Sequence, residues 1–303
     1  MQLRTVVSHI ILSVSLMIHA AAHAQEPVDD SGDEIQRSWD FGIGLGYGEL
    51  SNPFVASDDV PLYAILDFAW YGERFFFDNG DLGFTFVEEE KLGINAILNY
   101  SSERIYYSYF NELGIQLRSG ASASPGPPFS IEDSPLIRLP QESLTEGFGS
   151  NNIVPFDIPD RDFAFNLGVE FLWSGNWGEL QTQLTHDISS THDGAELWME
   201  YRYGWQWGDW SLRPSIGLSW KDQDLVDYYY GIDQDDNPGI PLFYDGDTTT
   251  NYFAGVSTAY RLNSHWSLVG TFRYERLGDE IRNSPLITED DTTSVFAGLF
   301  YRF

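Results

Sequence analysis

Histidines next to carboxylates are the residues of this 303-residue chain that could do chemistry. The pairs His186-Asp187 and His192-Asp193 stand close together, and a histidine beside an acid can bind a metal ion or transfer a proton. Only His265 joins them after residue 24, and there is no cysteine to supply a thiolate. A triad hydrolase needs serine, histidine and acid side chains that meet in space. With so few histidines we favour a polar strand end, and we predict no enzyme, no cofactor and no metal site.

A second candidate is a run of aspartates between residues 222 and 247. Asp233-x-Asp235-x-Asn237 has the spacing of a calcium loop, in which side-chain oxygens alternate around the ion. Pro238, however, stands where such a loop requires glycine. We therefore favour a solvated acidic loop that recruits divalent cations loosely over a dedicated calcium site.

Charged residues also recur at every second position in several segments. The set that we expect on one inner face is Glu170, Glu196, Glu200, Arg202, Arg213, Arg273 and Glu275. Cross-strand ion pairs that fill a narrow barrel would explain these charges, because neighbouring strands bring opposite charges within reach. The alternative is a set of lumen charges that selects small solutes.

Composition excludes several classes of protein. The chain has 46 Asp and Glu residues against 16 Lys and Arg residues, a net charge of −30 and a mean hydropathy of −0.27. With 16% aromatic residues, it is too rich in rings for an acidic disordered chain. It has too few cations for a basic surface, so no nucleic-acid partner is expected.

The first 24 residues have the parts of a secretory signal peptide. Arg4 precedes an apolar run from Ile10 to Ile18, and Ala22-His23-Ala24 is a small-residue cleavage pattern. The run is shorter than the ~20 residues that a membrane-spanning helix needs. Residues 25–38 are polar and acidic, and we predict a flexible periplasmic lead-in there. No later apolar run is long enough for a spanning helix, so any membrane crossing must use strands.

From Trp39 onwards the hydropathy alternates with a period of two residues, which indicates strands with one apolar face. The expected strands are 39–48, 61–71, 73–79, 81–88, 90–101, 161–173, 177–189, 194–207, 210–221, 250–261, 266–277 and 291–303. The turn Asn79-Gly80 predicts a hairpin with two short arms rather than one strand. Short turns alternate with long acidic loops that we expect outside the cell, 49–60, 102–160, 222–249 and 278–290. The prediction is an all-β fold, a transmembrane antiparallel up-and-down β-barrel of about 12 strands over residues 39–303.

Aromatic residues decide between this membrane barrel and a soluble β protein. They flank three expected turns, as Trp173 and Trp177, Trp207 and Trp210, and Tyr260 and Trp266. Rings at one height form a girdle where lipid meets water, and the opposite face, rich in Gly, Ser, Asn, Glu and Arg, suits a hydrated lumen. Leu299, Tyr301 and Phe303 end the last strand on one face, and we expect them to signal insertion to the barrel assembly machinery. These features favour the outer membrane of a Gram-negative bacterium.

Three segments carry a resemblance to a known family. Residues 61–86 place aromatic residues before Gly-Glu-Arg-Phe-Phe and a later Leu-Gly. Residues 227–287 contain Tyr-Tyr-Gly-Ile, Gly-Ile-Pro-Leu-Phe-Tyr-Asp, Tyr-Arg-Leu and Arg-Leu-Gly-Asp, and the chain closes with FAGLFYRF at 296–303. In this combination, which covers most of the chain after the signal peptide, the sequence resembles the MipA/OmpV family of MltA-interacting outer-membrane proteins.

The resemblance implies a non-enzymatic outer-membrane protein without a cofactor. It implies a scaffold that links a lytic transglycosylase to a murein synthase, among outer-membrane lipid and lipopolysaccharide. The alternatives that remain are a narrow porin-like channel and a surface-loop adhesin or antibiotic-response protein.

Overall fold

The computed structural model describes residues 38–55, 57–101, 103, 115–117, 161–233 and 243–303. The predicted signal peptide, the predicted lead-in apart from Ser38, and most of 102–160 lie outside these residues. Every strand belongs to one compact unit, Arg37–Phe303.

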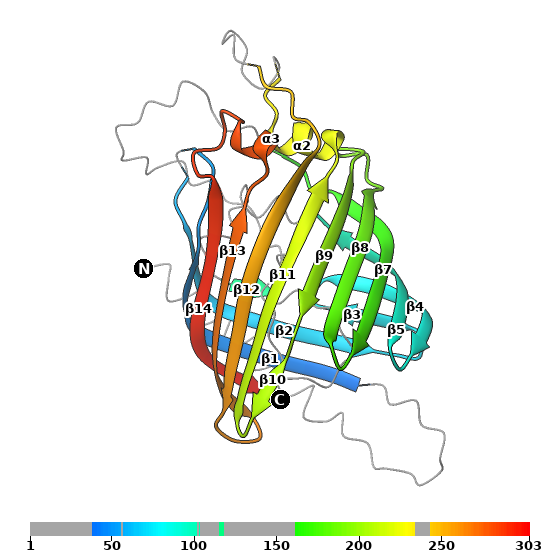
Figure 1. The fold of residues 1–303 in the computed structure, drawn as a ribbon, viewed down its shortest axis with the longest axis vertical. Coiled ribbons are helices and arrows are strands. Elements are labelled where there is room, and N and C mark those ends of the chain that lie inside the picture. The colour runs from blue at the N-terminus through cyan, green and yellow to red at the C-terminus, as the bar shows by residue number, and fades with distance from the viewer. Residues whose placement is uncertain (1–37, 56, 102, 104–114, 118–160, 234–242) are drawn as a thin grey trace, which may run out of the picture. The chain divides into compact units, whose positions relative to one another are not determined.

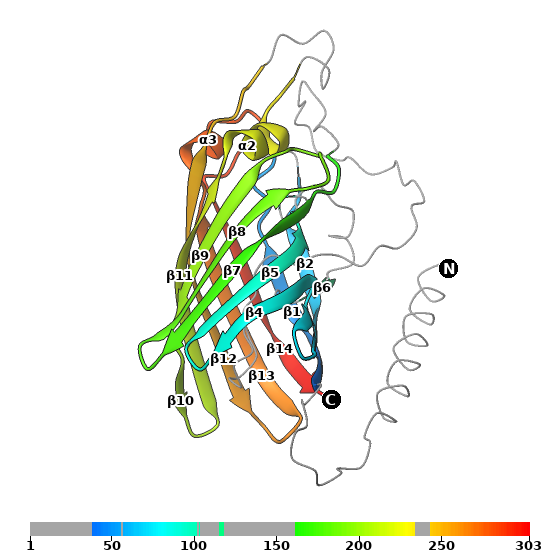
Figure 2. The same ribbon diagram turned by 90° about the vertical axis from the view of Figure 1, so that its right-hand side faces the viewer.

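Twelve antiparallel strands form the wall of a closed barrel, which confirms the predicted fold class and strand number (Figures 1 and 2). They are β1 (Ser38–Leu50), β2 (Val60–Tyr71), β3 (Phe75–Asp78), β4 (Asp81–Glu89), β5 (Leu92–Tyr100), β7 (Phe165–Gly175), β8 (Gly178–Asp187), β9 (Ala195–Arg202), β11 (Trp210–Lys221), β12 (Thr249–Arg261), β13 (Trp266–Arg276) and β14 (Asp291–Arg302). Each strand pairs with the next, and β1 pairs with both β2 and β14, so the sheet has closed on itself. Closure leaves no full-length edge strand unpaired.

Alternating side chains give the wall one apolar face and one inner face. On β7, for example, Phe165, Leu167 and Phe171 are exposed on the outside, whereas Asn166 and Glu170 are buried on the inside. Large exposed apolar residues on nearly every strand would be unfavourable in water but are stable against lipid. The period-two pattern therefore fixes which face of each strand meets the membrane.

The two ends of the barrel differ. The end that we call the loop end carries two short helices, α2 (Gln223–Tyr230) and α3 (Asp279–Arg282), and the longer connections (Figure 2). The end that we call the turn end carries the tight connections 176–177, 208–209 and 262–265. Neither helix, nor any other helix among the described residues, is long and apolar enough to cross a bilayer.

The predicted single strand 194–207 is wrong, because it breaks after Arg202 and resumes as β10 (Trp205–Trp207). Pro214 on β11 lies opposite Tyr203 at the break, since Arg202 pairs with Ser215 and Trp205 with Leu212. The Tyr203 N–H donates to the Pro214 carbonyl at 3.2 Å, but proline has no N–H to return the bond. The missing hydrogen bond explains why the pairing with β11 is interrupted at this position.

The hairpin predicted from strands 73–79 and 81–88 is present, with a first arm of only four residues, β3. Asn79 and Gly80 have φ values of 50° and 113°, which an Asn-Gly turn tolerates. The Asn79 side chain binds Asp67, Asp78 and the Phe68 N–H. Since β3 pairs only with residues 69–71 of β2, the rest of that edge is free to meet another segment, and β6 (Ile115–Leu117) pairs with residues 64–66 there in parallel.

An apolar cluster, which we call the cap, lies among the connections at the loop end. It consists of Phe54, Leu225, Val226, Tyr229, Tyr230, Ile232, Leu277, Ile281, Leu286 and Ile287. Backbone bonds join its segments, for Val55 N–H donates to Leu286 O and Thr288 N–H to Pro53 O, each at 2.8 Å. The expectation of a solvated loop over 222–249 is therefore wrong for Gln223–Tyr230, where α2 follows the N-cap Asp222 and buries four side chains, whereas Asp224, Asp245 and Asp247 are exposed.

A second apolar cluster lies inside the barrel, beside the polar residues for which a hydrated lumen was expected. We call it the inner cluster, and it consists of Val60, Leu62, Ile65, Ala259, Val269, Phe296 and Phe300. The Phe300 ring lies over the glycines of β1, where a Cβ on Gly42 would come within 2.1 Å of it. The absence of side chains at Gly42 and Gly44 thus makes room for the Phe300 ring of β14.

Candidate functional site

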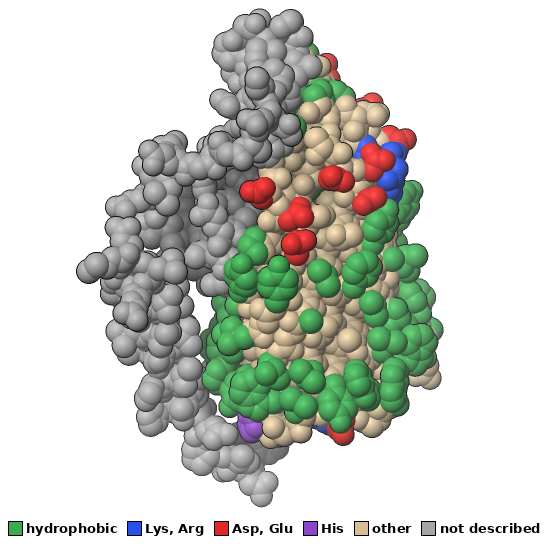
Figure 3. Space-filling view, turned by 90° about the vertical axis from the view of Figure 1, so that its left-hand side faces the viewer, with side chains coloured by type: hydrophobic (Ala, Val, Ile, Leu, Met, Phe, Trp, Pro, Cys, Tyr) green, Lys and Arg blue, Asp and Glu red, His purple; other side chains and the backbone are tan. Residues whose placement is uncertain are grey.

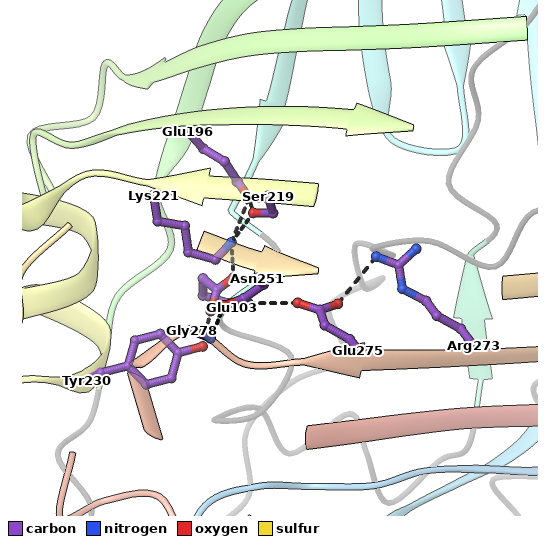
Figure 4. Close-up of polar contacts among 9 residues, drawn as sticks. All are labelled: Glu103, Glu196, Ser219, Lys221, Tyr230, Asn251, Arg273, Glu275 and Gly278. Atoms are coloured by element: carbon purple, nitrogen blue, oxygen red, sulfur yellow. Dashed lines mark hydrogen bonds and ion pairs between the residues drawn. The ribbon is translucent and has the colours of Figure 1, made fainter. Parts of the chain in front are cut away.

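One group of polar residues on the inner face lies around Lys221, the last residue of β11 (Figure 4). Its ammonium nitrogen lies 2.6 Å from a Glu196 carboxylate oxygen on β9 and 2.7 Å from the Ser219 hydroxyl. It also lies 2.9 Å from a carboxylate oxygen of Glu103, a residue that follows β5. The Tyr230 hydroxyl, from α2, donates to the other Glu103 oxygen. One cation thus joins the wall, the cap and the chain beyond β5.

A second group continues from this site onto β12 and β13 (Figure 4). The Asn251 amide donates to Glu275 at 2.7 Å and accepts the Gly278 N–H at 2.8 Å. The Arg273 guanidinium lies 3.3 Å from Glu275 and 3.6 Å from the centre of the Phe253 ring. Phe253 stacks in turn on Trp198, so charge and aromatic surface are packed together here.

A third group fills the inner face of β7, β8 and β9. Glu170 accepts hydrogen bonds from Asn95, Gln181 and Gln183 at 2.7–2.8 Å. Arg202 lies 2.8 Å from Glu179 and 3.3 Å from Glu200. A buried charge is tolerated only when it is paired or hydrogen-bonded, and these partners supply that compensation.

The structure places the predicted lumen residues as follows. Glu196, Glu170, Glu200, Arg202, Arg273 and Glu275 lie on the inner face with the partners given above. Arg213 lies on β11, opposite Ser257 of β12. The residues form separate groups on the wall and do not converge on a single centre.

The two His-Asp pairs do not form a common site. His186 is exposed on β8, whereas His192 is buried against Tyr228 and Tyr229 of α2. Asp187 accepts the backbone N–H groups of Ser189, Thr191, His192 and Asp193. It therefore holds the turn between β8 and β9, and its oxygens have neighbours other than a metal ion.

Burial shifts the pKa of His192 and of Asp227 at the loop end. Burial lowers the pKa of His192, although the carboxylates of Asp187, Asp222 and Glu196 act in the opposite direction. Its Nδ1 accepts the Gly194 N–H at 2.9 Å, which requires the neutral ring. Burial raises the pKa of Asp227, although its carboxylate accepts the Gly246 N–H at 2.8 Å.

No group of three or more His, Asp or Glu side chains in the described part of the chain is arranged to hold a metal ion. The possible calcium loop at Asp233-x-Asp235-x-Asn237 lies mostly outside the described residues. The paired charges described above therefore suit a structural role, in which opposite charges neutralise one another inside the barrel.

The aromatic residues that flank the turns contact one another across strands. Trp173 lies 5.2 Å from Trp177, Trp210 lies 4.9 Å from Tyr260, and Trp266 lies 4.8 Å from Tyr301, measured between ring centres. Trp207 pairs with Trp210 across the β10–β11 hairpin. On the face drawn in Figure 3, hydrophobic side chains form a broad band, with Asp and Glu side chains beyond it.

The last strand ends with apolar residues on the membrane face. Leu299 and Phe303 are exposed, and the Phe303 ring stacks on Phe41 at 4.9 Å. The Tyr301 ring lies 4.7 Å from that of Phe303. These contacts close the seam between β14 and β1 at the turn end.

The sequence did not point to Glu103 and Tyr230, the two residues that complete the Lys221 site. Glu103 stands just after a predicted strand, in a stretch without period-two alternation, and Tyr230 lies in a segment expected to be a loop. Lys221 itself had a visible signal, because it is a lone lysine that ends the inner-facing series of β11.

Relatives of the chain are outer-membrane proteins. It is 28% identical to the MltA-interacting protein of Escherichia coli (strain K12) over 148 residues, which are 48% of this chain and 59% of the relative. It is 28% identical to the outer membrane protein Omp26La of Vibrio anguillarum and 27% identical to OmpV of Vibrio cholerae, over 47% of this chain and 56% of each relative. The chain thus spans less than two thirds of the length of the curated relatives it matches.

Solved structures of outer-membrane barrels resemble the fold at a lower level. An outer membrane channel from Pseudomonas putida F1 gives a TM-score of 0.35 at 10% identity and covers 92% of this chain and 100% of its own. A Pseudomonas aeruginosa FadL homologue gives 0.38 at 8% identity, over 88% and 89%. The family model described as MltA-interacting protein MipA matches residues 41–303, and the chain belongs to this family of outer-membrane β-barrels.

Proposed function

We propose that this protein is a closed outer-membrane scaffold that brings a murein hydrolase and a murein synthase together at the turn end of its barrel. The observation that carries the proposal is that the barrel uses its own interior for packing. The name of the Escherichia coli relative, MltA-interacting protein, supports a murein enzyme as one partner.

The cap supports a closed barrel at the loop end. Phe54, Tyr230 and Ile287 come from three different connections, and all are buried together. The Ser284 hydroxyl donates to the Tyr230 carbonyl at 2.6 Å, which ties two of these connections to each other. A diffusion pore needs a water-filled mouth, whereas the connections at this end pack into a buried apolar cluster.

The barrel interior supports the same interpretation. The inner cluster fills the space beside β1, β2 and β14, while Glu200 and Arg202 are buried and paired on the opposite wall. Charges that select a permeating solute would face water. These charges face one another.

The turn end offers a surface for a partner. The β10–β11 hairpin extends past the turn that joins β7 and β8, and Trp205 and Trp207 are 49% and 54% exposed (Figure 1). Within the described residues, β10 pairs with β11 alone, so its other edge has free peptide groups. Exposed tryptophans beside an open strand edge are suited to bind a protein segment in extended conformation.

Crosslinking tests the scaffold. The full-length protein is purified from crosslinked cells, and we expect a murein hydrolase and a synthase above background by mass spectrometry. The variant Trp205→Ala/Trp207→Ala should recover less of both, because it removes the rings of the hairpin. Trp173→Ala is the matched control, since it removes a ring of the same type from another turn. Recovery of no murein enzyme from the unaltered protein would refute the scaffold.

A narrow channel is the second candidate, and the inward charges on neighbouring strands are what favour it. Planar bilayers containing the folded barrel separate the two. We expect no steady conductance from the sealed scaffold. Steps of reproducible size that depend on salt type would instead favour the channel.

A further inference from the structure

At the seam, side chains of β14 meet those of β2 across β1, the strand that separates them. Phe300 of β14 lies opposite Gly44 of β1, and Gly44 lies opposite Ile65 of β2. A Cβ atom built on Gly44 would be 3.3 Å from the Phe300 ring and 3.6 Å from the Ile65 Cβ atom. Both side chains belong to the inner cluster, so the two strands contact each other over a position without a side chain.

Arg302 repeats this arrangement two residues further along β14. It lies opposite Gly42, and Gly42 lies opposite Asp67 of β2. The Arg302 Nη2 atom lies 3.0 Å from a carboxylate oxygen of Asp40 on β1 and 3.9 Å from one of Asp67. An apolar residue of β14 thus faces an apolar residue of β2, and the cation that follows it faces an acid.

The other facing positions of β1 and β14 say little about the register of the two strands. The inner positions of β1 from residue 42 to residue 48 are all glycine, and outward pairs such as Leu45 and Leu299 are apolar. Register is weakly specified in a glycine-rich strand, because a shift changes few side-chain contacts. The contacts that β14 makes with β2 are therefore the ones that distinguish one register from another.

A shift of β14 by two residues would keep every side chain on its own face but would mismatch both contacts. Towards the loop end, the charge of Arg302 would come beside Ile65 of the inner cluster. Towards the turn end, the Phe300 ring would come beside Asp67. A buried charge among apolar side chains is unfavourable, so the observed register is the one that suits both residues.

The same two strands lead to contacts of the cap at the loop end. Phe54 follows β1 and forms an isolated bridge with Ile287, which precedes β14. Beside this bridge, Val55 N–H donates to the Leu286 carbonyl at 2.8 Å. A two-residue shift displaces one strand by about 6.8 Å relative to the other, because a strand rises by about 3.4 Å per residue. The register of the seam therefore decides whether these cap contacts form.

We propose that Arg302 is a positioning residue that selects, together with Phe300, the register in which the barrel closes. It does so by facing Asp67 of β2 across β1. Through the register, it also places Phe54 against Ile287 at the other end of the seam. This role goes beyond the scaffold function and does not depend on which partner binds at the turn end.

Because the chain contains no cysteine, pairs of introduced thiols report the register directly. Leu45→Cys is combined with Leu299→Cys, which lies opposite it in the observed register. Tyr301→Cys and Ala297→Cys, each with Leu45→Cys, report shifts of two residues towards the loop end and the turn end. Facing Cα atoms are about 5.5 Å apart, which a disulfide spans. The purified full-length protein is folded from urea into detergent micelles and oxidised, and non-reducing gels with mass spectrometry give the disulfide yield of each pair.

With Arg302 present, we expect the thiols at positions 45 and 299 to give by far the highest yield. Arg302→Met should raise the yield for positions 45 and 301 about fivefold, since a partly exposed ion pair changes the ratio of two states by up to that factor. Arg302→Lys keeps the charge and should give nearly the parent yields. Arg261→Met is the matched control, because it removes an exposed arginine at the turn end but away from the seam.

Hydrogen exchange of the Val55 amide gives a second readout, at the far end of the seam. It should accelerate in Arg302→Met and stay unchanged in Arg261→Met, which a purely local role of Arg302 would not explain. Altered thiol yields with unaltered exchange at Val55 would overturn the link between the register and the cap.

Unchanged thiol yields in Arg302→Met, migrating as a folded barrel before boiling, would overturn the proposal. So would an Arg302→Lys protein that shifts as far as Arg302→Met. If Arg302→Met does not fold, Asp67→Asn decides, because it removes the acid while its oxygen still accepts from the Asn79 amide. Parent yields in Asp67→Asn would then overturn the proposal. Loss of the murein partner in crosslinked cells would refute the scaffold and leave this result standing.

Discussion

The ring of Phe300 on β14 occupies the space in which Gly42 on β1 would carry a side chain. A Cβ atom built on Gly42 comes within 2.1 Å of the ring, whereas one on Gly44, two residues on, comes no closer than 3.3 Å. At the seam that closes the barrel, the Phe300 ring therefore packs into the space that a side chain at position 42 would take.

Gly42→Ala should destabilise the barrel by about 1–3 kcal/mol, because the added methyl group forces the Phe300 ring out of its place. Urea unfolding in detergent, followed by tryptophan fluorescence, gives the free energy of unfolding. Gly44→Ala is the matched control and should cost clearly less. Gly42→Ala/Phe300→Leu should recover part of the lost free energy of unfolding. A double variant less stable than Gly42→Ala would contradict this account of the packing between Gly42 and Phe300.

Arg202→Met should be far more damaging than loss of an exposed arginine. It leaves Glu179 and Glu200 without their cation on the inner face, at an expected cost of about 3–5 kcal/mol. Arg261→Met breaks the exposed pair with Asp209 and should cost about 0–1 kcal/mol. The same unfolding experiment measures both. Similar losses for the two variants would show that the inner charges meet water.

Acid should loosen the loop end through His192. Burial lowers the pKa of this ring in the folded protein below its ordinary value of 6.5, so the folded state favours the neutral ring. Its contribution to stability is complete above that ordinary value and is lost as the pH falls through the lowered one. Hydrogen exchange of α2, measured from pH 8 to pH 5 and corrected for the intrinsic rate, should therefore accelerate at the acid end.

Two variants check that His192 is the group responsible. His192→Phe keeps a ring against Tyr228 and Tyr229 without a titrating group, and it should flatten the pH dependence of exchange in α2. His186→Gln changes an exposed histidine nearby and should leave that dependence unaltered. A profile that persists in His192→Phe would assign the effect to the carboxylates instead.

Pro214→Val should join β9 and β10 into one continuous strand. The new N–H lies opposite the carbonyl of Tyr203, and one added hydrogen bond contributes about 1 kcal/mol. Hydrogen exchange should show protection at the new residue 214 amide, with the Tyr203 amide protected in both proteins as reference. A residue 214 amide that exchanges at the rate of an open loop would show that proline is not the cause of the break.

The sequence was informative where structure depends on neighbouring residues. Alternation along β7 and β12 sets their two faces, so the strand number, the barrel and the outer-membrane location could be predicted and are confirmed. Asn79-Gly80 marked its hairpin for the same local reason. That Pro214 lies opposite Tyr203 could not be predicted, because it depends on the register of two strands. A proline inside a strand pattern does, however, indicate that strand pairing is interrupted there.

Contacts between distant segments could not be predicted in this way. Phe54 meets Ile287 and Glu103 meets Lys221 through closure of the whole barrel. Helix α2 is short, with the sequence QDLVDYYY, which is polar on one side and aromatic on the other. Eight residues are too few to give a clear helical period, so the sequence did not predict this helix. The candidate site was therefore recognised as a set of inward charges, and its central cation was not.

The cap also has a consequence for how the protein can vary. Three connections that are far apart in the sequence share one apolar core, with Phe54, Tyr229 and Ile281 among its fully buried members. The sequences of surface loops usually vary independently of one another. Here an amino-acid substitution in one connection must remain compatible with the packing of the other two. Sequence variation among homologues should therefore be confined to the tips beyond the cap, and homologues should exchange its apolar residues in correlated sets.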